Sequence, residues 1–298
     1  MSELPRLKPD PIPAIHPVPE YAATGDLAEA YKWTREGLGV PWMGVVAMAF
    51  AHYPRFYETL WSALKPLVGS DAFTRACHDL REQAEQEAVA LSPPSISGRL
   101  GEIGYDQREI EEIRACNEVF SAGNMPYLLM ASLARLVLEG GKWPVGTVAG
   151  RTPEQGPDAP RPVLIEPHHA DATMSALYAD IRGTLGLPFV NTDYRAFARW
   201  PSYFAPAWAD LKRAVVRDDY EHHVARVHDR AVALAAGLPN PTGLSSDALR
   251  EAAAADATSE DVLAVVRLFQ WLLPGLALNV AFLREQLIDH RVLEQIAR

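Results

Sequence analysis

The chain has 298 residues, of which 48% are hydrophobic and 22% charged, a globular composition that excludes a disordered or fibrous protein. Its formal net charge of −10 argues against nucleic acid or an anionic membrane as a partner. Cys77 and Cys116 lie outside any C-x-x-C pattern, and the chain has no recognisable metal-ligand spacing, P-loop or dinucleotide motif. We therefore expect a cytoplasmic protein without a metal or cofactor.

The first 24 residues are predicted to form an extended arm, because they carry six prolines, at positions 5, 9, 11, 13, 17 and 19. Such an arm is expected to lie over a neighbouring part of the chain or over a partner subunit, and it is compatible with a homodimer. The most apolar long stretch, Val262 to Leu283, contains Arg267, Gln270, Pro274 and Asn279. A membrane span rarely carries these residues, so we predict a buried core helix.

Helical patterns follow one another along the whole chain, and no stretch shows the period-two alternation of a strand. In the first half the predicted helices are Ala30–Glu36, a short one after Pro41, one from Pro54, Ala72–Leu91, one from Asp106, and Pro126–Glu139. In the second half they are Ser175–Thr184, a short one after Pro188, one from Pro201, Tyr220–Ala236, one from Thr258, and Leu276–Ala297. The sequence therefore predicts an all-α fold.

The chain repeats itself once, at a constant offset of 147 residues, as in the pair Pro54 and Pro201. The segment GLGVPWMGVVAMAFAHYPRFYETLWSALKPLV aligns without a gap with TLGLPFVNTDYRAFARWPSYFAPAWADLKRAV. We predict two tandem helical repeats that form an intramolecular pseudo-dimer with a ligand groove between them. The expected parts are an arm at 1–24, a first repeat at 25–140, a long Pro/Gly-rich linker at 141–168 and a second repeat at 169–298.

One place breaks the chemical similarity of the two copies. Gly44-Val45-Val46-Ala47 of the first copy corresponds to Asn191-Thr192-Asp193-Tyr194 of the second, at the start of a short helix. Thr192 or Asp193 capping the helix is the simple explanation. The alternative is a catalytic carboxylate, because burial in an apolar groove raises the pKa of a carboxylate towards that of a general base. Backbone N–H groups at the two helix starts are then candidates to bind an anion.

A second polar residue, Asn124, interrupts the apolar segment FSAGNMPYLLMASL. Gly123-Asn124 is predicted to lie between two helices, where an ordinary turn is one interpretation, since asparagine tolerates the left-handed conformation. In the other interpretation the Asn124 amide points into the groove and orients a water molecule held by Asp193.

Three segments, VPWMGVVAMAFAHYP, SAGNMPYLLMASL and NTDYRAFARWP, together resemble the group I 2-haloacid dehalogenases from about residue 25 to the C-terminus. The resemblance implies an all-α pseudo-dimer in which Asp193 activates water that attacks C2 directly, displaces halide and inverts the configuration. It also implies that Asn124 positions this water.

The resemblance extends to the residues expected to bind substrate. Trp42 matches a pocket tryptophan, and Phe269 matches a pocket aromatic that is tyrosine in some relatives. The substrate carboxylate is expected to meet backbone N–H groups near Val45 and Thr192. Asn191 matches the D-specific relatives, since a smaller residue at this position accompanies activity on both enantiomers. We therefore expect D-2-haloacids as substrates.

Two other functions stay open at this point. An AhpD-like helical redox protein needs a reactive cysteine pair, which Cys77 and Cys116 do not provide by their spacing. A catalytically silent protein that binds a small organic acid keeps the groove but needs no activated water.

Overall fold

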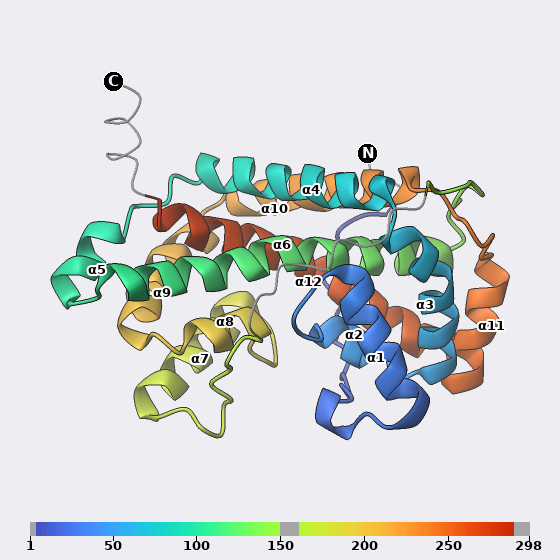
Figure 1. Ribbon diagram of the computed structural model, residues 1–298, viewed down its shortest axis with the longest axis horizontal. Helices are drawn as coiled ribbons and strands as arrows, with labels where there is room; N and C mark the ends of the chain where they lie inside the picture. The colour runs from blue at the N-terminus through green and yellow to red at the C-terminus, as the bar shows by residue number, and fades with distance from the viewer. Residues whose placement is uncertain (1–3, 150–160, 289–298) are drawn as a thin grey trace. The chain divides into compact units, whose positions relative to one another are not determined.

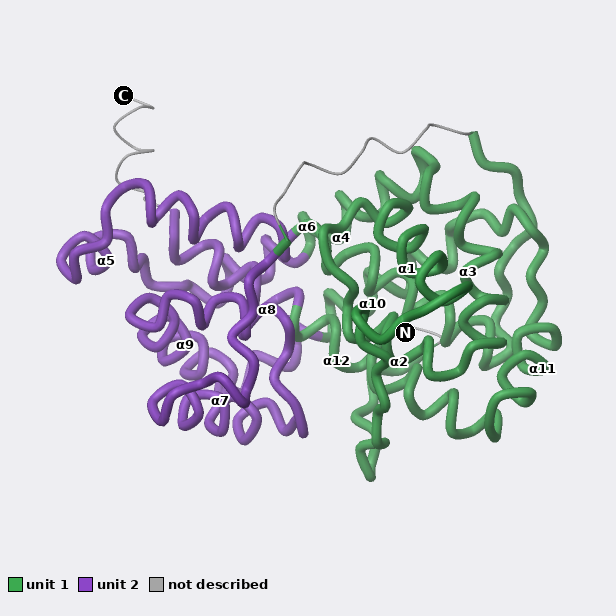
Figure 2. Tube along the Cα trace, turned by 60° about the horizontal axis from the view of Figure 1, so that its bottom comes forward, with its two compact units in different colours: residues 1–83, 122–161, 225–276 green, residues 84–121, 162–224, 277–298 purple. Residues whose placement is uncertain are grey.

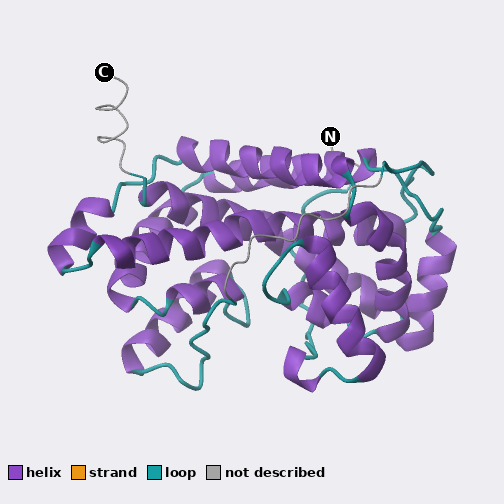
Figure 3. Ribbon diagram, viewed as in Figure 1, coloured by secondary structure: helices purple, strands orange, loops and turns teal. Residues whose placement is uncertain are grey.

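A computed structural model describes residues 4–149 and 161–288. Within these ranges every regular element is a helix, and Figure 3 shows no strand there. The all-α prediction is therefore confirmed for the described part of the chain. The bounds, labelled in Figure 1, are η1 (Glu20–Ala22), α1 (Gly25–Leu38), α2 (Val45–Phe50), α3 (Pro54–Val68), α4 (Asp71–Ala90), α5 (Ser97–Ile103), α6 (Gln107–Leu138), α7 (Ala172–Leu185), α8 (Thr192–Phe197), α9 (Pro201–Val215), α10 (Tyr220–Gly237), α11 (Ser246–Asp256) and α12 (Ser259–Gln286).

Local sequence sets the bounds of the first three helices in each half. Pro54 and Pro201 occupy the first turns of α3 and α9, where a fixed φ suits a helix and a missing N–H costs nothing. Gly39 and Gly186 end α1 and α7 with a φ of 64° each, a left-handed conformation that glycine adopts most easily. As a result α7, α8 and α9 begin and end 147 residues after α1, α2 and α3.

Hydrogen bonds recur at the same offset. In each half a tyrosine hydroxyl donates to the carbonyl oxygen of a residue that precedes the first helix. The backbone N–H of that same accepting residue donates to a carbonyl oxygen of the short helix. The pairs are Tyr31 Oη to Val18 O and Tyr178 Oη to Ile165 O, both 2.7 Å, then Val18 N to Met48 O (3.1 Å) and Ile165 N to Arg195 O (3.0 Å). The segments before α1 and α7 are therefore fixed in the same way.

The chain divides into two compact units that are not its two sequence halves (Figure 2). Unit 1 comprises Met1–Gln83, Ala122–Arg161 and Ala225–Leu276, and unit 2 comprises Ala84–Ser121, Pro162–Val224 and Ala277–Arg298. In unit 1, α3 packs against both α1 and α11, and in unit 2, α7 packs against α9. The helices α4, α6, α10 and α12 each contribute to both units.

The two long helices correct the sequence prediction. We expected separate helices from Asp106 and from Pro126, and again from Thr258 and from Leu276, but α6 and α12 are continuous. Each contains one internal proline, Pro126 or Pro274, which removes one backbone hydrogen bond without ending the helix. Burial of their apolar side chains outweighs that loss. The short helices α5 and α11 were not predicted.

The apolar helix α12 is long enough to cross a membrane by length and composition. Its most apolar 18-residue window has a mean hydropathy of 1.5, and 67% of that window is buried inside the protein. The predicted continuation of this helix to Ala297 reaches residues 289–298, which lie outside the described residues, as do positions 150–160 of the predicted linker.

The N-terminal arm contacts its own unit. Leu4 is buried against Leu136 and Val232, and Arg6 Nε donates to the carbonyl oxygen of Trp271 at 3.1 Å. The carbonyl oxygen of Pro5 accepts a hydrogen bond from Arg135 at 2.9 Å. The start of the arm therefore packs on α6, α10 and α12 of unit 1.

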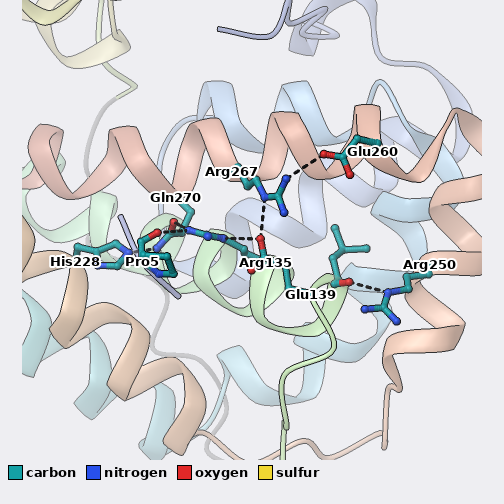
Figure 4. A network of polar contacts seen from close by, with 9 residues as sticks. Pro5, Arg135, Glu139, His228, Arg250, Glu260, Arg267 and Gln270 are labelled. Carbon is teal, nitrogen blue, oxygen red and sulfur yellow. Dashed lines mark hydrogen bonds and ion pairs between the residues drawn. The ribbon is translucent and has the colours of Figure 1, made fainter. Parts of the chain in front are cut away.

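Arg135 is the centre of a buried polar network in unit 1 (Figure 4). Its guanidinium also donates to the side-chain oxygens of Gln270 and Glu139, and Glu139 accepts a second bond from Arg267. Although burial alone raises the pKa of Glu139, the two arginines hold it below its ordinary value. The Gln270 amide nitrogen meets His228 Nε2, and His228 Nδ1 lies 2.9 Å from a carboxylate oxygen of Asp229. This pattern assigns a neutral imidazole with its proton on Nδ1.

Burial lowers the pKa of His228 below its ordinary value of 6.5, and Asp229 only partly opposes this shift. Because the pKa of His228 is lower in the folded protein, the unfolded chain binds a proton on this side chain more readily than the folded protein does. The contribution of His228 to the free energy of unfolding is therefore complete above about pH 6.5 and is lost as the pH falls further. We predict that the stability difference between wild type and His228→Gln shrinks between about pH 8 and pH 5.5, by at most about 1.4 kcal/mol per pH unit. Urea unfolding of both proteins measures it, and a difference independent of pH contradicts the prediction.

Candidate active site

The predicted catalytic carboxylate lies in unit 2, at the second position of α8. Asp193 is 2% exposed, and so is Val46, its counterpart in α2 of unit 1. The two helices have the same length and corresponding bounds. A carboxylate is therefore not needed to form this helix, and its burial costs stability that a valine does not cost.

Simple capping does not account for Thr192 or Asp193. The N-cap residue of α8 is Asn191, whose side chain makes no capping hydrogen bond, and Thr192 and Asp193 are the first two helical residues. The N-cap of α2, Gly44, likewise has no side-chain capping bond. Both short helices thus begin without the usual side-chain cap.

Helix α6 lies close to Asp193 within unit 2. Burial, together with the negative charge of Asp193, raises the pKa of the Cys116 thiol to about 12, and Arg199 opposes this shift. One turn further along α6, Phe120 packs edge-on against Phe197 of α8, with ring centroids 5.8 Å apart. The end of α8 therefore packs on α6, and the charge of Asp193 acts on Cys116 of the same helix.

An ion pair fixes the solvent side of α8. Arg195 Nη1 donates to both carboxylate oxygens of Glu166 at 2.7 Å, and Arg195 Nη2 donates to the Thr192 hydroxyl at 3.2 Å. Asn191 is 5% exposed, and its buried side-chain oxygen has no hydrogen-bond partner in the described structure. A buried acceptor without a partner next to Asp193 is a polar group available to a ligand.

Unit 1 holds the other predicted site residues, Trp42, Val45, Asn124 and Phe269. Trp42 is 7% exposed and lies 6.0 Å from Tyr127, measured between ring centroids. The Tyr127 hydroxyl donates to the carbonyl oxygen of Trp42 and accepts from the amide of Gly44, both at 2.8 Å. Tyr127 therefore fixes the segment that carries Trp42 into α2, and Val45 is the first residue of that helix.

We predicted that Asn124 lies between two helices. This prediction is wrong, because Asn124 lies inside α6. It is 4% exposed, so the asparagine is a buried polar group within a helix rather than a loop residue. The adjacent Gly123 leaves room for Trp42, because a Cβ at this position would lie 2.3 Å from Trp42 Cη2. Close approach of the tryptophan to the helix, and not a turn, explains the glycine at position 123.

Phe269 of α12 is 1% exposed and packs edge-on against Phe50 of α2, with centroids 6.0 Å apart. The sequence analysis missed Tyr127 and Glu166, which hold the segment before α2 and the side of α8. The proline-flanked repeat draws attention to the helices themselves, but neither tyrosine nor glutamate at these positions belongs to a recognisable motif. Only the folded chain brings them to their partners.

Both cysteines are unsuited to thiol chemistry. Burial raises the pKa of Cys77 and Cys116, and the two residues belong to different units. A thiol with a raised pKa is a poor nucleophile. The structure thus opposes the AhpD-like redox function.

Fold and site together define an all-α protein with a buried carboxylate at the start of a short helix. The family described as halocarboxylic acid dehydrogenase DehI matches residues 41–187. An (R)-2-haloacid dehalogenase from Rhizobium sp. (strain NHG3) is 44% identical over 83% of this chain and 97% of that protein. One from Pseudomonas putida is 37% identical over 91% of this chain and 92% of that protein.

A solved D-2-haloacid dehalogenase in complex with L-LA is 36% identical, with a TM-score of 0.87 over 97% of this chain and 100% of that chain. The chain therefore belongs to the 2-haloacid dehalogenase family, in the group that contains the (R)- or D-specific enzymes. The family resemblance found in the sequence is confirmed.

The close approach of Trp42 to Gly123 is testable. Alanine is normally favoured over glycine in a helix by about 1 kcal/mol, but at position 123 the added methyl group meets Trp42. We predict that Gly123→Ala lowers the free energy of unfolding by about 1–3 kcal/mol through overpacking. Gly183→Ala in α7, where nothing lies within 4 Å of the added atom, is the matched control and should not destabilise. Equal unfolding free energies for the two variants in urea would contradict the assigned packing.

Proposed function

We propose that this protein hydrolyses short D-2-haloalkanoic acids to 2-hydroxyalkanoic acids, with Asp193 as the general base. The activity and the enantiomer follow from family membership at 44% and 37% identity. The role of Asp193 rests on one observation: a carboxylate replaces valine at a buried position of a helix that forms equally well without it. A buried carboxylate that costs stability and is not needed to form its helix is best explained by chemistry.

The proposed reaction has a single displacement step. The Asp193 carboxylate takes a proton from a water molecule as the water oxygen forms a bond to C2 of the substrate. The carbon–halogen bond breaks at the same time, and the halide leaves with the bonding electron pair. Attack from the side opposite the halogen inverts the configuration, so a D-2-haloacid gives an L-2-hydroxyacid. Asp193 then returns its proton to solvent.

Asn124 is assigned to hold the water that Asp193 activates. A buried amide offers a hydrogen-bond donor and an acceptor at once, which orients a water lone pair. Asn124 is spaced four residues from Phe120 and eight from Cys116, so the three residues lie on one face of α6. That spacing supports a shared role for Asn124 and Asp193.

Substrate contacts are assigned to the remaining predicted residues. Trp42 and Phe269 supply apolar surface for the halogen and the alkyl group. Backbone N–H groups near Val45 and Thr192, at helix starts without a side-chain cap, are assigned to the substrate carboxylate. Asn191, with its unpartnered buried oxygen, is assigned to selection of the D-enantiomer.

We also infer that the chain contains two tandem repeats that form a pseudo-dimer, joined by the Pro/Gly-rich linker at 141–168. The corresponding bounds of α1–α3 and α7–α9 support this duplication. In this architecture only the second repeat supplies a catalytic carboxylate.

The first test measures halide release from separate D- and L-2-chloropropionate by wild type and Asp193→Asn, with no added metal or cofactor. We expect release from the D-enantiomer alone, with L-lactate as product, and a loss of about 10³-fold in kcat for Asp193→Asn. The variant should unfold no more easily than wild type, because it removes a buried charge.

Asp210→Asn is the matched control for this test. Asp210 is also a buried carboxylate of unit 2, but it pairs with Arg213 at 2.6 Å, so its loss should lower stability and leave kcat unchanged. Release from both enantiomers would contradict the role of Asn191. No release from either would indicate a silent acid-binding protein, and full activity in Asp193→Asn would overturn the mechanism.

A further inference from the structure

The residue after Asp193 also differs between the two short helices. Tyr194 of α8 corresponds to Ala47 of α2, and both are fully buried. The Tyr194 ring stacks on Phe204 at 6.1 Å and meets Trp208 edge-on at 5.9 Å, measured between centroids. Both partners lie on α9, so the ring anchors the first turn of α8 to its neighbour in unit 2.

The Tyr194 hydroxyl has a further partner on α12. Asn279 Nδ2 donates to it at 2.9 Å, and the Asn279 side-chain oxygen accepts from the hydroxyl of Tyr220 at 2.7 Å. Asn279 is 2% exposed and Tyr220 5%. The Asn279 amide thus bridges the hydroxyls of Tyr194 and Tyr220, using one side-chain atom as donor and the other as acceptor.

The Tyr194 hydroxyl, which links α8 to Asn279 of α12, stays protonated. Burial is the main reason that the pKa of Tyr194 lies well above 10, and the charge of Asp193 adds to the shift. The buried Tyr194 hydroxyl is therefore neutral near pH 7.

We propose that Asn279 is a positioning residue for Asp193. Its amide, held by Tyr220, fixes the Tyr194 hydroxyl and with it the first turn of α8 that carries the carboxylate. The inference rests on the proposed role of Asp193 as the base. In unit 1 a tyrosine hydroxyl likewise fixes the start of the short helix, since the Tyr127 hydroxyl of α6 bonds to the backbone that leads into α2.

The test uses Tyr194→Phe, which removes only the hydroxyl, and Asn279→Leu, which removes the amide at nearly constant volume. With D-2-chloropropionate as substrate, we expect kcat to fall about tenfold or more in each variant, since a small misplacement of a catalytic group is costly. KM should change less than about threefold, because neither residue is assigned to the substrate. The double variant should lose little more than Asn279→Leu alone, because both changes break the same connection.

Asn240→Ala is the matched control. Asn240 is a buried asparagine of unit 1 that bonds to the backbone of Leu244, so its loss should lower stability without changing kcat per folded molecule. If Tyr194→Phe and Asn279→Leu behave like this control, or change KM alone, the inference is overturned. Asp193→Asn in the same assay separates the two claims: its full activity would overturn the proposed function and this inference together. Its inactivity, with unchanged kcat in the other two variants, would overturn the inference alone.

Discussion

The proposed base is carried by a helix of only six residues, and isolated helices of that length are not stable in water. Everything that holds Asp193 in place must therefore come from tertiary contacts. Phe197 packs on α6, the Tyr194 ring packs on α9, and the Tyr194 hydroxyl is bonded to Asn279 of α12. These contacts keep a carboxylate buried at a position where α2 has a valine. The free energy lost by burying that charge is offset by the aromatic packing of the same helix.

The same requirement explains why the long helices matter. α6 and α12 supply Phe120 and Asn279 to α8 in unit 2, and Tyr127 and Phe269 to the region of α2 in unit 1. Each short helix thus depends on residues far away in the sequence. In unit 1 the result is a fixed tryptophan beside Gly123, and in unit 2 it is a fixed carboxylate.

The sequence predicted the parts that depend on local rules. Proline at positions 54 and 201 placed the starts of two helices, and the repeat drew attention to Asp193. It failed where packing overrides local preference: Pro126 and Pro274 suggested breaks, yet α6 and α12 continue through them. Gly123-Asn124 was expected between two helices, but it lies inside α6. The partners of Tyr194 and Trp42 could not be predicted, since they come from the packing of distant segments.

The claim that water attacks C2 directly is tested most directly by a single turnover in heavy-oxygen water, with enzyme in excess over D-2-chloropropionate. Direct attack predicts that the hydroxyl oxygen of the L-lactate carries the heavy isotope from the first turnover, and that Asp193 acquires none. Unlabelled lactate together with heavy oxygen in the Asp193 carboxylate would instead show a covalent ester intermediate, which would contradict the role of Asp193 as a general base.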